Sequence, residues 1–127
     1  MKRHAIALLL AVLSGAAMAD WQQVSDDSEA VGYYDPTTLV RTGDLVTVSE
    51  LGDFKRVATT VSDALFRSTM TQRAYDCASS RTRILTLQPF EGQMGTGRAL
   101  DIMNVDGQWQ DIVAGSARAD AFNRACQ

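Results

Sequence analysis

Short apolar runs of strand length, separated by turn-forming residues, fill most of the chain between residues 21 and 112. Runs of this kind, bounded by Gly, Pro, Asn or Asp, are typical of β-strands. We expect strands at residues 21–24, 30–35, 45–51, 57–61, 66–77 and 81–88.

Several residues are expected to end or interrupt these strands. Pro36 and Pro89 lack the amide hydrogen that a strand ladder uses, so each is predicted to stop the run before it. The Gly52-Asp53 pair is predicted to break a run that alternates from residue 45 onward. Around Ser62-Asp63 the pattern leaves two alternatives open, either separate strands or one pair with an irregular join.

Two glycines mark tight turns. Gly43 can supply the positive φ that a hairpin turn requires. The Asp106-Gly107 pair is a strong two-residue hairpin signal, and it predicts that residues 102–105 and 108–112 form paired strands.

The end of the chain has a helical pattern instead. Ser116 can cap a helix over residues 117–126, with Asp120 near its positive start and Arg124 near its negative end. Helical spacing would place three residues on the buried face, namely Ala119, Phe122 and Cys126. The sequence therefore predicts an α+β fold, an antiparallel sheet of about six strands with one C-terminal helix packed against it.

Residues 1–19 have the three parts of a secretory signal peptide. A basic start at residues 2–4 precedes nine apolar residues, and the segment ends in Ala-Met-Ala, so we expect cleavage between Ala19 and Asp20. The alternative, a transmembrane anchor, needs about 20 apolar residues, which this run does not reach. Asp20 stands where a lipoprotein carries cysteine, so no lipid anchor is expected.

Cleavage would leave one domain, residues 20–127, soluble in the periplasm or secreted. This chain carries ten basic and fifteen acidic residues, a net charge of −5, and no histidine, because His4 lies in the signal segment. The charge disfavours nucleic-acid and anionic membrane partners. Histidine-based hydrolases and histidine-ligated zinc are largely excluded as well.

The two cysteines, Cys77 and Cys126, are 49 residues apart. In an exported chain a single disulfide is the economical interpretation, and it would tie the helix to the strand ending at Cys77. A redox-active pair is the alternative, but redox sites usually have C-x-x-C spacing.

The most suggestive polar cluster is Arg81 and Arg83, which follow Asp76. Residues at i and i+2 share one face of a strand, so the two arginines could bind an anionic ligand or pair with nearby acids. Together with Trp109 they form our candidate binding surface, against the alternative that the aromatic side chain belongs to the core.

Other motifs do not indicate a cofactor or metal. Residues 104–107 resemble part of a calcium loop, but an EF-hand placed on Gly107 would have Ile102 and Val113 at its acidic positions. The glycine-rich residues 92–97 lack the Gly-Lys-Ser/Thr of a P-loop and favour a turn. A pair of carboxylates could still catalyse glycoside hydrolysis, but no short motif brings two together among Glu29, Glu50 and Glu91.

The ordered set of features resembles the surface-adhesin protein E family of bacterial exported proteins. The residues that carry the resemblance are Trp21, Val24, Tyr34-Asp35, Arg41, Gly43, Val46, Val48, Leu51, Asp53-Phe54-Lys55, Ser68, Asp76-Cys77, Arg81, Arg83, Trp109, Ile112, Gly115-Ser116 and Ala125-Cys126. The resemblance implies a sheet with a C-terminal helix and a Cys77–Cys126 pairing. It also implies adhesion, since the family's namesake is a lipid-anchored adhesin of host matrix proteins.

We therefore expect a non-enzymatic domain that binds a protein or an envelope component. One alternative is a small exported inhibitor of a hydrolase such as lysozyme. The other is a carboxylate-based hydrolase, which would require two acids to meet in a pocket.

Overall fold

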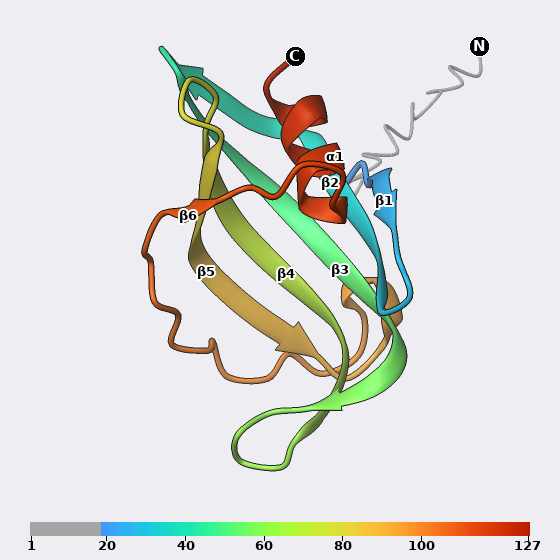
Figure 1. Cartoon of the computed structure of the whole chain (residues 1–127). Helices are drawn as coiled ribbons and strands as arrows, with labels where there is room; N and C mark the ends of the chain where they lie inside the picture. Colours follow the sequence, from blue (N-terminus) through green and yellow to red (C-terminus); the bar gives the residue numbers. More distant parts are fainter. Residues whose placement is uncertain (1–18) are drawn as a thin grey trace, which may run out of the picture.

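The computed structural model describes residues 19–127 and forms one six-stranded antiparallel sheet with the strands in sequence order (Figure 1). The predicted signal peptide lies outside this range except for Ala19, which is exposed beside Asp20. The elements are β1 (Gln22–Asp26), β2 (Ala30–Thr42), β3 (Leu45–Thr59), β4 (Leu65–Asp76), β5 (Arg81–Phe90), a 3-10 turn η1 (Gln93–Gly95), β6 (Gln110–Asp111) and helix α1 (Ala117–Ala125). The α+β prediction is confirmed.

Strands β2, β3 and β5 run through the residues predicted to stop them. Pro36 lies within an irregularity of the β2–β3 register, where a missing amide hydrogen breaks no regular ladder. Gly52 stays in the ladder, paired with Gly32 on one side and Thr69 on the other. Pro89 pairs with Thr69 in β5, which is close to an edge strand because β6 adds only two residues beyond it. Pairing between distant segments therefore overrides these local breakers.

The hairpin predicted at Asp106-Gly107 is wrong. Of the two predicted strands only Gln110–Asp111 is regular, and it pairs with the start of β5. The segment before it runs along β5 and makes isolated bridges, one of them between Met103 and Leu87. The chain thus uses these residues to cover the open edge of β5 and not to pair with each other.

Helix α1 confirms the predicted cap and nearly the predicted length. The Ser116 hydroxyl accepts a hydrogen bond from the Ala119 amide. The buried residues of the helix are Ala121 and Ala125, with Phe122 packed edge-on against Tyr75. Ala119 is not part of the core, so the predicted buried face is rotated toward Ala121 and Ala125.

The two faces of the sheet are covered differently. Helix α1 lies over one face of the sheet, here called the helix-side face (Figure 1). On this face Tyr34, Val46, Val48 and Tyr75 form a core with the helix. On the opposite face η1 packs over the sheet, where the Gly95 amide donates to the Ser68 hydroxyl at 2.9 Å. The glycine-rich loop therefore has a structural role as a cover.

Candidate functional site

The predicted binding residues lie on the opposite face of the sheet at the β5 edge. Arg83 is paired with Ala74 in β4, and its guanidinium lies 5.3 Å from the centre of the Trp109 ring. Trp109 immediately precedes β6, whose Gln110 pairs with Thr82. Because Arg83 follows Thr82 on the paired strand, the two side chains meet as neighbours on one face. The structure thus brings Arg83 and Trp109 together in a cation–π contact.

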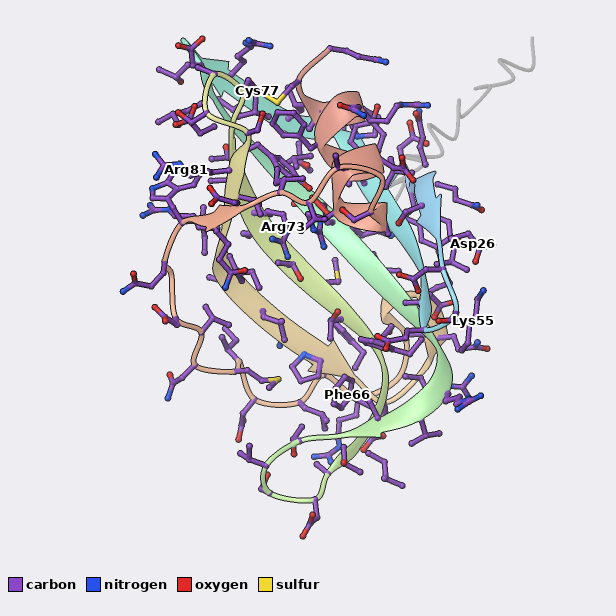
Figure 2. All side chains as sticks on the ribbon, in the orientation of Figure 1. Asp26, Lys55, Phe66, Arg73, Cys77 and Arg81 are labelled. Carbon is purple, nitrogen blue, oxygen red and sulfur yellow. A yellow bond between two sulfur atoms is a disulfide. The ribbon has the colours of Figure 1, made fainter. Side chains whose placement is uncertain are left out.

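Arg81 has a different environment from Arg83. It pairs with Asp76 on β4 and with Asp111 on β6. Its Nη2 lies 4.0 Å from Asp76 Oδ2, and Figure 2 shows it at the outer edge of the sheet. The ion pair with Asp76 matches the structural alternative, in which Arg81 joins neighbouring strands, so Arg83 is the arginine left for a ligand.

A second polar cluster, which the sequence reasoning missed, lies buried on the helix-side face. Both oxygens of the Glu50 carboxylate accept hydrogen bonds, Oε1 from Arg118 Nη1 at 2.5 Å and Oε2 from the Tyr75 hydroxyl. Arg118 also donates to the Tyr75 hydroxyl at 3.0 Å. Arg73 Nε lies 3.8 Å from Glu50 Oε2, and Arg73 Nη1 donates to the Thr82 hydroxyl at 3.2 Å. We call Glu50, Arg73, Tyr75 and Arg118 the buried cluster.

Burial and neighbouring charges shift the pKa values of residues in the buried cluster. Burial and the adjacent Glu50 carboxylate raise the pKa of Tyr75 well above its ordinary value, so the phenol stays protonated and donates to Glu50. Burial lowers the pKa of Arg73, and the nearby Arg118 charge adds to that effect. Burial is the largest influence on Arg118 and acts to lower its pKa, but the contacts with Glu50 and Tyr75 together outweigh burial and the net shift is upward.

One signal could have pointed to this cluster. Glu50 continues the alternation of Val46 and Val48, so it lies on their buried face of β3. A charged residue at such a position needs a partner. The partners come from β4 and from α1, at sequence separations of 25 and 68 residues, and the sequence does not reveal those contacts.

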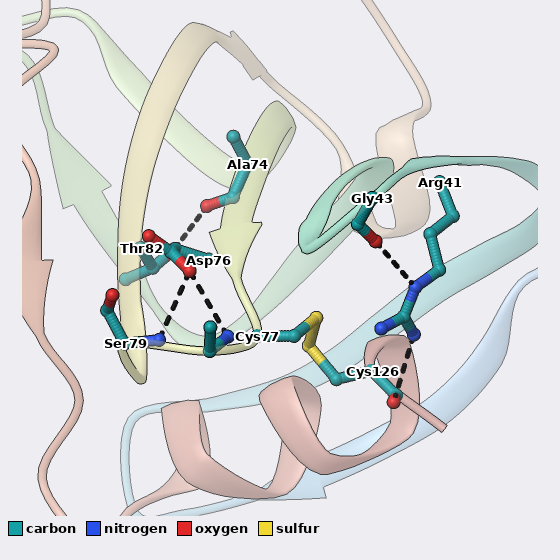
Figure 3. The surroundings of a disulfide bond; sticks show 9 residues. Arg41, Gly43, Ala74, Asp76, Cys77, Ser79, Thr82 and Cys126 are labelled. Carbon is teal, nitrogen blue, oxygen red and sulfur yellow. Dashed lines mark hydrogen bonds between the residues drawn. A yellow bond between two sulfur atoms is a disulfide. The ribbon is translucent and has the colours of Figure 1, made fainter.

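The disulfide holds the helix over the sheet. Cys77 and Cys126 are bonded, with their Cα atoms 5.7 Å apart. Figure 3 shows the bond between the β4–β5 turn and the end of α1, with Arg41 donating to the carbonyl groups of Gly43 and Cys126. The predicted disulfide is confirmed, and it anchors the end of the helix whose first turn carries Arg118.

Within residues 19–127, no group of three His, Cys, Asp or Glu residues is arranged to hold a metal ion. In the same range, no helix has the length and hydropathy needed to cross a membrane.

A family model for surface-adhesin protein E matches residues 21–127. The chain belongs to the surface-adhesin protein E family. Among curated proteins, none matches the chain at a significant level.

Solved structures of Haemophilus influenzae protein E share the fold of this member of the family. One has a TM-score of 0.67 at 9% identity, covering 87% of this chain and 86% of the other. Protein E from non-typeable Haemophilus influenzae has a TM-score of 0.65 at 9% identity, with coverages of 87% and 78%. A second crystal form of Haemophilus influenzae protein E has a TM-score of 0.64 at 10% identity, with coverages of 81% and 91%.

Proposed function

We propose that this adhesin E protein is exported and acts, without catalysis, by binding a protein of the cell envelope or of the surroundings. Family membership supports a binding role. The signal-like residues 1–19 support export to the periplasm, with secretion as the alternative. The observation that carries the proposed contact site is the Arg83 guanidinium, 5.3 Å over the Trp109 ring at the sheet edge.

Arg83 and Trp109 are suited to protein recognition. Tryptophan and arginine are the residue types most enriched among those that dominate binding energy at interfaces. The indole gives a flat apolar surface, and the guanidinium gives fixed donors for a carboxylate. We infer a partner segment that sets an acidic side chain against Arg83 and an apolar or planar group against Trp109.

Net charge shapes how such a partner would bind. The exported chain would carry a charge of −5, so an acidic partner would not be steered to it from a distance. Recognition would then depend on short-range contacts at Arg83 and Trp109, and salt would have little effect on the association rate.

The test is affinity capture with matched variants. Purified protein, immobilised and exposed to periplasmic extract and separately to culture medium, should retain a partner identifiable by mass spectrometry. Trp109→Ala and Arg83→Ala should each lower its yield, by about tenfold or more for the tryptophan. Arg98→Ala is the control, since Arg98 is an exposed arginine paired with Glu91 outside this surface. Equal capture by all variants, or no retained partner, would contradict the proposal.

A further inference from the structure

A groove opens on the helix-side face, beside the buried cluster and the first turn of α1. Its volume is about 210 Å³, and its walls include Ser25, Thr69, Thr71, Arg73 and Arg118. Figure 2 shows Arg73 on this face, below the helix and in the middle of the sheet. Pockets for drug-sized ligands measure about 300 Å³ or more. This groove therefore matches a smaller ligand, about the size of one amino acid residue.

The groove exists because its floor carries no side chains. Gly32 and Gly52 are paired across β2 and β3, and both line the groove. A Cβ on Gly32 would lie 2.2 Å from the Ser25 hydroxyl oxygen, so that hydroxyl would have to turn away. A Cβ on Gly52 would meet only the Thr69 hydroxyl, at 3.3 Å. Gly52 does not have a positive φ that would call for glycine, and its lack of a side chain keeps the groove open.

The groove wall contains a guanidinium group, that of Arg73, with an unpaired hydrogen-bond donor. The Arg73 side chain is only 10% exposed, yet within the described residues its Nε has no hydrogen-bond partner. Among residues 19–127 its one carboxylate neighbour is Glu50, which is already bonded to Arg118 and Tyr75. The other acid on the groove, Asp27, is used to accept hydrogen bonds from two amides of its own turn. Two guanidinium groups thus share one carboxylate, which leaves an excess positive charge next to the cavity.

We propose that this groove binds the carboxylate of a small ligand such as the C-terminal residue of a peptide. The carboxylate would meet Arg73 and the 38% exposed Arg118, and the rest of the ligand would lie over Gly52 between the Thr69 and Thr71 hydroxyls. Arginine–carboxylate contacts are charge-assisted and geometrically selective.

This site is separate from the Arg83–Trp109 surface. Arg83 pairs with Ala74, whereas Arg73 flanks Ala74 in β4 and so projects from the other face. The proposed carboxylate site can therefore be supported or refuted independently of the proposed protein-binding surface.

The test is a titration of purified protein followed by amide NMR. The probes are N-acetyl-glycyl-alanine as the free acid, the same dipeptide as its C-terminal amide, N-acetyl-glutamate α-amide and inorganic phosphate. The free acid should shift the amide signals of Gly52, Thr69 and Thr71, and the dipeptide amide should bind at least about tenfold more weakly. Stronger binding of the glutamate probe would assign the carboxylate to an acidic side chain and would also support the site.

Variants locate the binding. Gly52→Val fills the floor and should weaken binding by about tenfold or more, whereas Thr47→Val, on the opposite face of β3, should leave it unchanged. If Gly52→Val lowers the melting temperature, Thr71→Val removes a groove hydroxyl at nearly constant volume and should weaken binding several-fold. Shifts outside the groove, equal binding of acid and amide, equal binding of phosphate, or full affinity in both groove variants would overturn the proposal.

Discussion

Replacing Glu50 with alanine should destabilise the protein through the charge it leaves behind. Glu50 is the only acidic member of the buried cluster, and its carboxylate is bonded to Arg118 and Tyr75 with Arg73 Nε at 3.8 Å. Arg118 is 38% exposed and can turn toward water, but Arg73 is 10% exposed and cannot. The variant therefore leaves one buried guanidinium without a counter-charge.

The expected magnitude follows from these exposures. Removing one partner of a buried ion pair costs about 3–5 kcal/mol, and the lower end applies here because only Arg73 stays buried without compensation. The Tyr75 hydroxyl also loses its main acceptor, which adds about 1 kcal/mol. We expect Glu50→Ala to lower the free energy of unfolding by about 4 kcal/mol.

A second substitution separates the cost of the unpaired Arg73 charge from the cost of lost side-chain packing. Arg73→Met keeps a long apolar side chain and removes the charge, so in the Glu50→Ala background it should restore about 2 kcal/mol. In the wild type the same substitution should be destabilising, since Thr82 and Glu50 lose a neighbour. Glu50→Gln is the control for side-chain volume.

The assay is urea unfolding followed by tryptophan fluorescence, with equal m-values required before the free energies are compared. A coupling energy near zero between positions 50 and 73 would refute the reasoning, because contacting residues of one network must be non-additive. A loss of less than about 1 kcal/mol in Glu50→Ala would refute it as well.

Three further predictions follow from the described contacts. Cys126→Ser opens a loop of 49 residues closed by Cys77 and should cost about 4 kcal/mol in the chain-entropy model, measured as the urea midpoint difference that reduction of the wild type should reproduce. Burial and Glu50 raise the pKa of Tyr75, so unfolded tyrosine ionises before folded Tyr75 does. The Tyr75 contribution to stability should therefore be constant below pH about 9 and be lost as the pH rises above about 10, so the alkaline fall in stability should be shallower in Tyr75→Phe. Ser116→Ala removes the cap of α1 and should cost about 1 kcal/mol by thermal unfolding, whereas an unchanged midpoint would mean that the Ala119 amide finds another acceptor.

The sequence predicted correctly features that depend on a few neighbouring residues, such as the cap of α1 and the β2–β3 turn. Ser116 placed the start of α1 because a hydroxyl at that position satisfies an amide in the first turn. Gly43 marked the β2–β3 turn, where its φ is 61°. The strand boundaries predicted from Gly52 and Pro89 are wrong, because long-range pairing holds both residues inside strands.

In the candidate sites, too, local spacing predicted some features and long-range pairing determined the others. The i and i+2 spacing placed Arg81 and Arg83 on one face, but their different neighbours depend on which strands pair with β5. The buried cluster combines Glu50 of β3, Tyr75 of β4 and Arg118 of α1. Such a meeting depends on strand register and helix docking, which alternation within one segment cannot specify.

Photo-crosslinking in cells tests the proposed binding role most directly. A photoreactive residue at Gln108, exposed beside Trp109, should form a discrete adduct with another protein, and Arg83→Ala should abolish that adduct. The same residue at Asn123, exposed on α1, is the positional control. An adduct from Gln108 that depends on Arg83, and none from Asn123, is the predicted result. No adduct from Gln108, or the same adduct from both positions, would contradict the account.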